Sequence, residues 1–495
     1  FPDHPFAWKV LAVVLSQNGK IRESLAASQK SVQLEPHDSG AHNNLANALK
    51  ALGRLAEAET SYNKAIILKR DYAEAHYNLG NTLKELGKLE KAETSYKKAI
   101  TLKPDYAETH NNLGNTLQEL RKLDEAEASY RQAITLKPDY AEAHNNLGVL
   151  LKEQGKVKEA EVSYLQAISL KPNYTQAHYN LGVLLQELGR LDEAEASYNQ
   201  AIALKPSFAD ALLNRWMILF DQKRYEAALK DADLYVSKGS RALDLTTLYA
   251  LGKIEEIYKR IETQSKIDGE NLNIAAFAAF IAETEKKPTA YNFCPNPIDF
   301  IHVSNISSNL KNSTEFIREL IGELNSIKTI WEPHGRTARK GFVTDKKFNL
   351  FESSSEKLAQ LKAIIFNEID AYYLKFQKES CSYIKKWPSE ISIHGWHVVL
   401  KQQGYNTAHI HPTGWLSGVI YLKVVPSHGK NEGAIEFSLN GQNYHHKNSP
   451  SLIFQPEVGD IVFFPSSLHH KTIPFTTDTD RIIISFDLMP EATKH

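Results

Sequence analysis

The sequence predicts a multidomain α + β protein, in which an N-terminal all-α superhelix is followed by a double-stranded β-helix, or jelly-roll, domain with flanking helices. Three observations lead to this fold class. The first half of the chain repeats with a period of 34 residues, as an alignment of residues 41–72 with 75–106 shows. The last part contains short runs of β-branched and aromatic residues separated by turn signals. Finally, 495 residues are too many for one hydrophobic core, since domains usually hold about 100–200.

The 34-residue units have the residue pattern of a helix-turn-helix. Small residues such as Gly80 and Ala92 stand where two helices must approach, and Leu83 and Tyr96 can fill the space between neighbouring units. The pattern resembles the tetratricopeptide (TPR) repeat, and the resemblance covers residues 1–240 with about seven repeats. It implies a superhelix of paired helices. The first unit and the degenerate seventh unit are expected to be caps.

Beyond the repeats we expect a helical cap and junction at residues 241–290 and the jelly-roll domain at residues 291–495. The segment 292–297, NFCPNP, interrupts the helical pattern. Residues 313–378 are expected to form two or three helices that pack on one face of the sheets. Strands are expected at 391–400, 416–425, 434–439, 451–456, 460–465 and 481–488.

Composition narrows the function classes. The net charge of -1 provides no basic surface, so we expect no nucleic-acid partner. Cys294 and Cys381 are the only cysteines, which excludes a disulfide framework and a four-cysteine zinc site and favours the reducing cytoplasm. No stretch reaches the roughly 20 apolar residues that span a bilayer, so we expect no membrane partner and a buried helix at residues 274–281. Nothing in the composition indicates an oligomeric state, and the start at FPDHPFAW without methionine suggests a piece of a longer product.

A histidine pair and a third, distant histidine suggest a metal site near the C-terminus. His409 and His411 are separated by one residue, so on a strand both imidazoles face the same side. His470 lies in a later part of the β-rich region and can supply a third nitrogen. Three imidazoles that meet on one face can hold a metal ion.

The order of motifs between residues 396 and 486 resembles the Fe(II)/2-oxoglutarate-dependent oxygenases, particularly their bacterial group. The matching segments are Trp396, Gly404, HIHP at 409–412, SGVIYL at 417–422, GDIVFFPSSLHH at 459–470 and RIIISF at 481–486. The resemblance implies a dioxygenase that uses Fe(II) and 2-oxoglutarate, with O2 as cosubstrate. It implies that His409, His411 and His470 are the catalytic metal ligands. It also implies that Arg481 binds the far carboxylate of 2-oxoglutarate as a bidentate fork and that Tyr421 hydrogen-bonds the same group.

One position departs from the family pattern. Most members have H-x-D, whereas this chain has His411 at the acidic position. Three arrangements remain open: a three-histidine site, a two-histidine site completed by water, and a site that recruits a carboxylate from Asp460 or Glu436. We prefer the three-histidine site.

Other histidines have less specific interpretations. His469 could replace His470 as the ligand, although the alignment of FPSSLHH favours His470. His445 and His446 follow a turn and are expected on a surface loop. His394 and His397 flank Trp396, and a single strand histidine is more often a structural residue than a ligand.

An asparagine recurs at the sixth position of the first helix in successive repeats. Positions 2, 5, 6 and 9 of that helix share the concave face of a TPR superhelix. A carboxamide has one acceptor and two donors, which suits a peptide group, so a ladder of carboxamides could bind an extended polypeptide backbone. The superhelix of protein O-GlcNAc transferases looks similar in this respect. The alternative is that asparagine bridges adjacent turns or is merely copied with the repeat. The candidate substrate-binding residues are Asn44, Asn78, Asn112, Asn146, Asn180 and Asn214.

The fusion of a TPR array to an oxygenase resembles the arrangement of several protein hydroxylases. The first hypothesis is therefore an Fe(II)/2-oxoglutarate-dependent dioxygenase that hydroxylates a protein or peptide held in the TPR groove. The second is a hydroxylase or three-histidine dioxygenase of a small molecule or glycan, with the repeats as an assembly scaffold. The third is a TPR scaffold with an inactive jelly roll. Arg481 argues against a reaction without 2-oxoglutarate, and the three histidines argue against inactivity.

Overall fold

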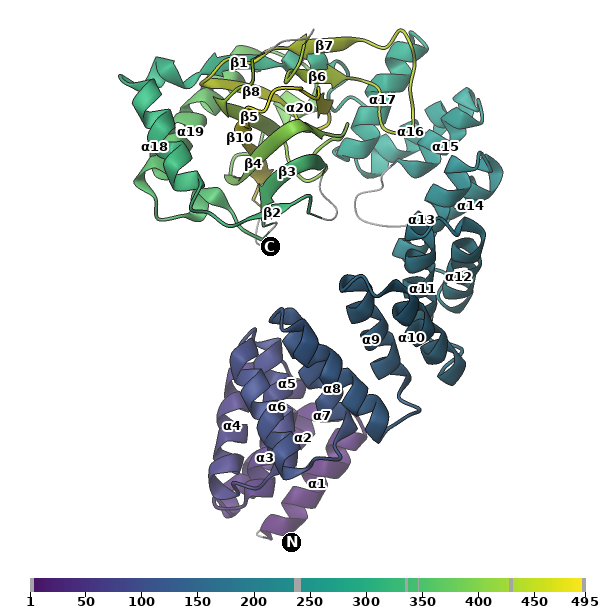
Figure 1. Ribbon diagram of the computed structural model, residues 1–495, viewed down its shortest axis with the longest axis vertical. Coiled ribbons are helices and arrows are strands. Elements are labelled where there is room, and N and C mark those ends of the chain that lie inside the picture. The colour runs from purple at the N-terminus through teal and green to yellow at the C-terminus, as the bar shows by residue number, and fades with distance from the viewer. Residues whose placement is uncertain (1–3, 236–241, 334–336, 346, 427–430, 492–495) are drawn as a thin grey trace. The chain divides into compact units, whose positions relative to one another are not determined.

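The structure, a computed structural model, describes residues 4–235, 242–333, 337–345, 347–426 and 431–491 (Figure 1). The chain divides into two compact units, Phe1–Ile218 and Leu219–His495. The domain boundary expected at residue 240 lies outside the described residues, and the one expected at residue 290 stays a prediction. Within the described ranges, no helix is long and apolar enough to cross a membrane.

The first unit consists of helices that follow one another in antiparallel pairs. The first helix of each repeat from α3 to α13 begins 34 residues after the previous one, as the sequence period predicts. Helix α13 crosses the boundary between the two units. The helices are α1 (Pro5–Gln17), α2 (Ile21–Leu34), α3 (Ser39–Ala51), α4 (Leu55–Leu68), α5 (Ala73–Glu85), α6 (Leu89–Leu102), α7 (Ala107–Glu119), α8 (Leu123–Leu136), α9 (Ala141–Glu153), α10 (Val157–Leu170), α11 (Thr175–Glu187), α12 (Leu191–Leu204) and α13 (Ala209–Asp221).

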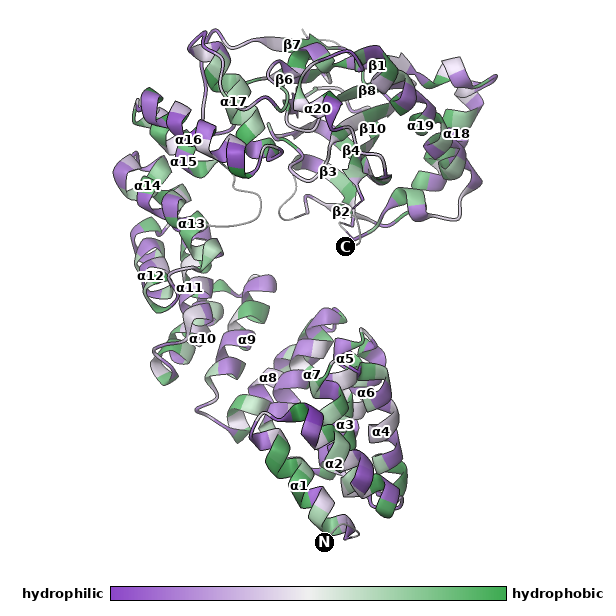
Figure 2. Cartoon of the chain, turned by 180° about the vertical axis from the view of Figure 1, so that it is seen from behind, coloured by the Kyte–Doolittle hydropathy of each residue, from purple (hydrophilic) through white to green (hydrophobic). Residues whose placement is uncertain are grey.

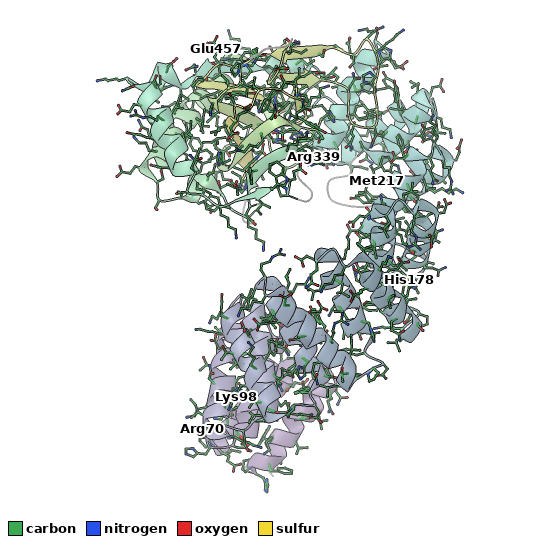
Figure 3. All side chains as sticks on the ribbon, in the orientation of Figure 1. Arg70, Lys98, His178, Met217, Arg339 and Glu457 are labelled. Atoms are coloured by element: carbon green, nitrogen blue, oxygen red, sulfur yellow. The ribbon has the colours of Figure 1, made fainter. Side chains whose placement is uncertain are left out.

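Two features recur in the repeats formed by α5 to α12 and hold their helices in place. A Cβ added to Gly80 would lie 2.6 Å from the ring of Tyr96, so glycine is what lets this tyrosine pack against the first helix. The tyrosine is fully buried, and its hydroxyl donates to Asn81 Oδ1 over 2.7 Å. A histidine near the start of the first helix contacts the preceding loop; Nε2 of His178, labelled in Figure 3, lies 2.9 Å from the carbonyl oxygen of Pro172. The small-residue packing expected from the sequence is therefore confirmed.

The second unit begins with helices that continue the repeat geometry. Each repeat turns between its helices at a residue with positive φ, and this turn recurs 34 residues apart at Gly252 (φ 70°) and Lys286 (φ 51°). Helix α17 is apolar on all sides (Figure 2) and is almost entirely buried, which confirms the expectation for residues 274–281. Its Phe277 and Phe280 contact Tyr444 of the β-rich part, so these helices share a core with the sheets. The helices are α14 (Tyr225–Leu234), α15 (Leu243–Ala250), α16 (Ile254–Ile267) and α17 (Leu272–Thr284).

The rest of the second unit is a jelly roll of antiparallel strands. One sheet has seven strands in the order β1-β8-β5-β10-β4-β3-β2, and the other has three in the order β7-β6-β9. Helix α19 places Leu358, Leu361, Ile365 and Ile369 on one buried stripe, and with α18 it lies beside the large sheet (Figure 1). The strands are β1 (His302–Asn305), β2 (Thr329–Trp331), β3 (Ala338–Thr344), β4 (Ile391–Asn406), β5 (Leu416–Lys423), β6 (Ile435–Ser438), β7 (Ser451–Phe454), β8 (Asp460–Pro465), β9 (His469–Thr472) and β10 (Arg481–Pro490). The helices and 3-10 turns are η1 (Pro297–Phe300), η2 (Ile306–Asn309), α18 (Ser313–Leu324), η3 (Leu350–Glu352), α19 (Glu356–Phe376) and α20 (Ser382–Lys385).

The fold class is as predicted, and the six expected strands correspond to β4, β5, β6, β7, β8 and β10. Four strands were not predicted: β1, β2, β3 and β9. Strands β2 and β3 lie inside the region expected to be helical, between α18 and α19. All four are short or lie toward a sheet edge, where pairing with a distant strand stabilises the extended chain more than its own residue pattern does.

Candidate metal centre

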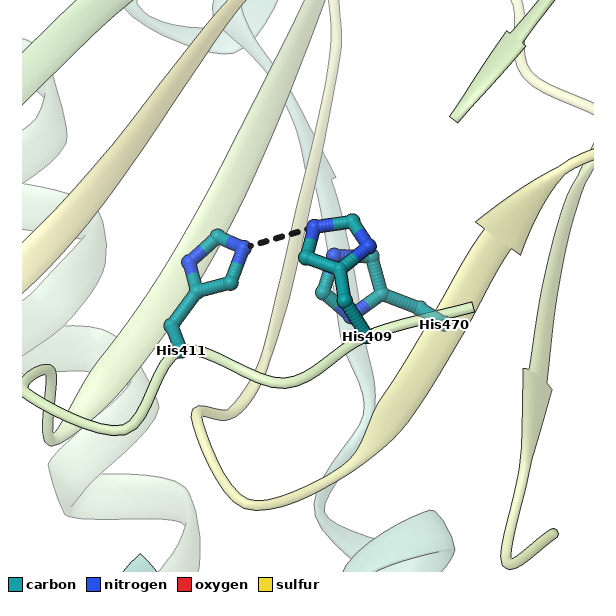
Figure 4. A group of neighbouring side chains, drawn as sticks. All are labelled: His409, His411 and His470. Atoms are coloured by element: carbon teal, nitrogen blue, oxygen red, sulfur yellow. Dashed lines mark hydrogen bonds between the residues drawn. The ribbon is translucent and has the colours of Figure 1, made fainter. Parts of the chain in front are cut away.

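The three candidate ligands come together where the two sheets meet. His409 lies in the connection between β4 and β5, and its backbone forms an isolated bridge with His470 of β9, with both N–H···O distances at 3.1 Å. The backbone N–H of His411 donates to the carbonyl of Ser466 over 2.9 Å. One nitrogen from each of the three rings lies within 4.8 Å of the others (Figure 4). The structure thus brings together the histidines that the sequence selected.

Each ring has Nδ1 turned toward an oxygen acceptor. His409 Nδ1 lies 2.7 Å from the carbonyl of Thr407, and His470 Nδ1 lies 3.2 Å from the carbonyl of Leu468. His411 Nδ1 lies 2.5 Å from Oδ1 of Asp487. Because a carbonyl or carboxylate oxygen pairs only with an N–H, these contacts assign the proton of each neutral ring to Nδ1. The lone pair of each Nε2 is then free for a metal.

The free nitrogens are spaced for a cation. The Nε2 atoms of His409 and His411 lie 3.2 Å apart, as the dashed line in Figure 4 marks. Two unprotonated nitrogens repel at this distance, whereas two ligands at right angles on a metal about 2.1 Å away are separated by about 3 Å. The donor set therefore fits an ion bound on one face by three imidazoles, with the opposite positions open.

Burial lowers the pKa of two of these rings, His409 and His470. Burial, together with the neighbouring His411 ring, lowers the pKa of His409 to about 3. Burial and the two neighbouring imidazoles also hold the pKa of His470 well below its ordinary value. Protons therefore do not compete with a metal ion for these two nitrogens near neutral pH.

A buried cation lies in the same cavity. Arg481 is 1% exposed, and its Nε and Nη1 atoms have no hydrogen-bond partner in the described part of the chain. The guanidinium lies 5.0 Å from the ring centroid of Tyr421, whose hydroxyl is also buried without a partner among the described residues. Burial raises the pKa of Tyr421 to about 12, so its phenol stays a donor. Buried donors without acceptors are costly, so the pair fits a carboxylate such as the far end of 2-oxoglutarate.

These groups line one cavity of about 600 Å³ between the two sheets. Alternate residues of the central strand β10 face it, namely Arg481, Ile483, Ser485, Asp487 and Met489. The aromatic ring of Trp396 lies 5.5 Å from the ring of His411 at the same cavity. A cleft of about 480 Å³ adjoins it and shares the lining residues Asn406 and Thr472.

The carboxylate nearest the three histidines was missed in the sequence. Asp487 accepts from His411 Nδ1 and, over 2.7 Å, from Ser417 Oγ. The carboxylates considered earlier are elsewhere: Asp460 binds Asn305, and Glu436 pairs with Lys471. The sequence does contain an indication of this role. Asp487 is a charged residue in an apolar strand and lies an even number of residues after Arg481, so the two side chains face the same side of the strand.

The remaining histidines are separated from this group. His469 faces away from it and packs edge-on against Tyr444 at 5.7 Å. His445 is an exposed residue of the loop between β6 and β7, and the backbone of the adjacent His446 is bonded to Asn440. His394 lines the cavity beside Trp396, whereas its neighbour His397 does not.

His397 is expected to make the protein sensitive to acid. The ring is 1% exposed, neither ring nitrogen has a partner within the described residues, and burial lowers its pKa to about 4. The unfolded chain takes up this proton near pH 6.5, whereas the folded chain does so only near pH 4. Stability from this residue is therefore present above pH 6.5 and is lost on acidification toward pH 4, by about 3 kcal/mol.

This prediction is checked by urea unfolding of the wild type and His397→Leu between pH 4 and pH 7. The variant should lose less stability on acidification than the wild type does. Equal losses in both proteins would contradict the assignment, and the exposed His445→Leu variant serves as the control.

The recurring asparagines lie in register, and all of them except Asn44 form a side-chain bond to the preceding repeat among the described residues. Asn112 Nδ2 donates to Asn81 Oδ1 over 3.0 Å, Asn146 Nδ2 to Asn111 Oδ1 over 3.0 Å, and Asn180 Nδ2 to Asn145 Oδ1 over 2.9 Å. Asn78 and Asn214 make equivalent, longer contacts with the preceding repeat. These bonds support the bridging role. Among the described residues, Nδ2 of Asn146 and Asn180 contacts one acceptor each, which leaves one N–H for a ligand, whereas Nδ2 of Asn78, Asn112 and Asn214 contacts two. The side chains are partly exposed, and their binding role stays a prediction.

The fold and the site together define a class of protein, a TPR repeat array joined to an oxygenase-type jelly roll. Comparison with family models agrees. Residues 394–487 match the family described as "Putative 2OG-Fe(II) oxygenase". Residues 46–87, 80–121, 119–155 and 150–189 match the model described as TPR repeat, and residues 175–208 match tetratricopeptide repeat. The chain therefore contains TPR repeats and a 2OG-Fe(II) oxygenase domain.

Further comparisons found partial similarities. No curated protein matches the chain. Among solved structures, MamA is 25% identical, and the match covers 34% of this chain and 97% of that one with a TM-score of 0.32. YrrB, titled a TPR protein with an unusual peptide-binding site, is 24% identical over 40% of this chain and 98% of that one, with a TM-score of 0.33. Pseudomonas aeruginosa pilF is 19% identical over 45% and 96%, with a TM-score of 0.38.

Proposed function

We propose that this protein is an Fe(II)/2-oxoglutarate-dependent dioxygenase that hydroxylates a side chain of a protein or peptide held by the TPR groove. The observation that carries the proposal is the cavity that combines three converging imidazoles with a buried Arg481, whose Nε and Nη1 have no hydrogen-bond partner among the described residues. Neither feature alone is specific, but a metal site beside a buried cation suits a cofactor that chelates metal at one end and is a carboxylate at the other.

The residues that line the cavity have different tasks in this proposal. His409, His411 and His470 would hold the iron, and their Nδ1 bonds keep the rings oriented toward it. Arg481 and Tyr421 would bind and orient the far carboxylate of 2-oxoglutarate. When bound, Fe(II), 2-oxoglutarate and O2 supply the oxidising chemistry that converts a substrate C–H into C–OH. The apolar walls, such as Val398, Val419 and Ile483, exclude water from the reacting atoms.

The adjoining cleft supports a polymeric substrate. It lies between segments 405–408 and 471–474 and meets the main cavity at Asn406 and Thr472. An extended chain lying in this cleft could place one side chain in the cavity. A small molecule would occupy only the main cavity and would leave the adjoining cleft empty.

To test the proposal, the protein is first loaded with Fe(II) under anaerobic conditions. It is then mixed with 2-oxoglutarate and a peptide library derived from a proteome, and the mixture is exposed to O2. Mass spectrometry should find peptides heavier by one oxygen atom, formed together with succinate. Succinate formation stimulated by small molecules or glycans but by no peptide would favour the second hypothesis. No 2-oxoglutarate turnover with any substrate would exclude a 2-oxoglutarate-dependent enzyme.

The asparagine ladder gives a prediction that separates a substrate groove from a scaffold. Each carboxamide is expected to contribute about 0.5–1.5 kcal/mol, so alanine at Asn78, Asn112, Asn146 and Asn180 together should weaken peptide binding by about one order of magnitude or more. A single substitution should be nearly silent. The quadruple variant should stay folded because alanine is the better helix former, and it should keep basal 2-oxoglutarate turnover.

Fluorescence anisotropy with a substrate peptide measures the affinity, and the exposed Asn63→Ala is the control. Unchanged affinity in a folded quadruple variant would mean that the asparagines serve only to bridge repeats.

A further inference from the structure

The carboxylate of Asp487 sits directly behind one proposed metal ligand. Its Oδ1 lies 2.5 Å from Nδ1 of His411, and the residue is only 8% exposed. Ser417 Oγ donates to the same oxygen over 2.7 Å and is itself 2.7 Å from Ser466 Oγ. A carboxylate buried in this way is held in place by the surrounding hydroxyls and by the imidazole.

The loop after His411 is closed tightly around this network. A Cβ added to Gly414 would lie 2.7 Å from Ser466 Oγ and 3.1 Å from Cγ of Asp487. The backbone N–H groups of Gly414 and Trp415 donate to His411 and Leu488, respectively. The position of the carboxylate relative to His411 is therefore fixed by packing on several sides.

We propose that Asp487 is a positioning residue that supplies the negative charge missing from the three-histidine site. Three neutral imidazoles leave the full charge of a divalent ion uncompensated. A carboxylate bonded to Nδ1–H raises the basicity of Nε2 and fixes the tautomer and ring orientation of His411. In an H-x-D site the aspartate carboxylate binds the metal directly. Here the carboxylate of Asp487 would act on the metal through the imidazole of His411. This inference rests on the proposed iron site.

The test is Co(II) binding to the full chain, followed by the visible absorption of the bound ion. Asp487→Asn, which keeps the size of the side chain but removes its charge, should weaken Co(II) binding by roughly 10–100-fold and change the spectrum, while the thermal unfolding temperature of the metal-free protein changes little. Asp460→Asn is the matched control, because that carboxylate is bonded to Asn305 away from the three histidines. Co(II) affinity within about twofold of wild type in a folded Asp487→Asn variant would overturn the inference.

Two further variants separate the possible failures. If Asp487→Asn does not fold, Asp487→Ser decides, because it also removes the charge but leaves a smaller side chain; a tenfold or greater loss of Co(II) affinity supports the inference, and an affinity within about twofold of wild type contradicts it. His470→Ala reports on the underlying site. Loss of Co(II) binding in His470→Ala but not in Asp487→Asn would refute only the role of Asp487, whereas retention in both would refute the proposed metal site.

Discussion

The His470→Ala variant is expected to lose iron binding and with it all 2-oxoglutarate turnover. The wild-type protein should bind about one Fe(II) per chain, because His409, His411 and His470 present three free nitrogens within 4.8 Å of one another. Removing one of three direct ligands should cost more than the roughly 10–100-fold that loss of an outer partner costs. Anaerobic titration with Fe(II) measures the affinity, and succinate formation measures turnover.

The exposed His445→Ala is the matched control, since it removes one imidazole from the same domain without touching the cavity. It should bind Fe(II) as the wild type does. A His470→Ala variant with wild-type iron affinity would show that the metal is held elsewhere. The neighbouring His469→Ala variant then becomes informative, because it was the other candidate in the sequence.

The Arg481→Met variant is expected to lose 2-oxoglutarate affinity while it keeps the metal. A buried charge that loses its partner typically costs about 2–5 kcal/mol, so binding should weaken by roughly 30-fold or more. Calorimetry on the metal-loaded protein measures this affinity. Equal affinities in wild type and variant would show that Arg481 does not bind the cosubstrate and would move weight to the second hypothesis.

The same variant makes an opposite prediction for stability. In the protein without 2-oxoglutarate, Nε and Nη1 of Arg481 are buried without partners among the described residues. Replacing a buried unpaired charge by an apolar side chain of similar length should raise the unfolding temperature of this form. Adding 2-oxoglutarate should raise the unfolding temperature of the wild type but not of Arg481→Met. The exposed Arg318→Ala should behave as the wild type in both measurements.

The sequence by itself predicted the repeats and the three histidines and the arginine that the structure brings together in one cavity. The 34-residue period predicts where each helix begins, because the small residues and tyrosines that let two helices pack are neighbours within one repeat. The order of motifs around His409, His411, His470 and Arg481 predicts which residues meet, since it specifies consecutive strands of one fold. These signals are local or depend only on the order of elements, so they can be read along the chain.

The tertiary structure alone decided the contacts between residues that no local pattern relates. Asp487 reaches His411 across a separation of 76 residues only because β10 lies between β4 and β5 in the large sheet. The carboxamides of the recurring asparagines form hydrogen bonds between adjacent repeats. These residues therefore connect the repeats, a role that is separate from the proposed binding of a substrate. Strand β9 carries His470 yet has little strand pattern of its own, since it is held by β6 and by the bridge to His409. Such contacts depend on strand order and on the closure of long loops, and the free energy that fixes them is shared by the whole core.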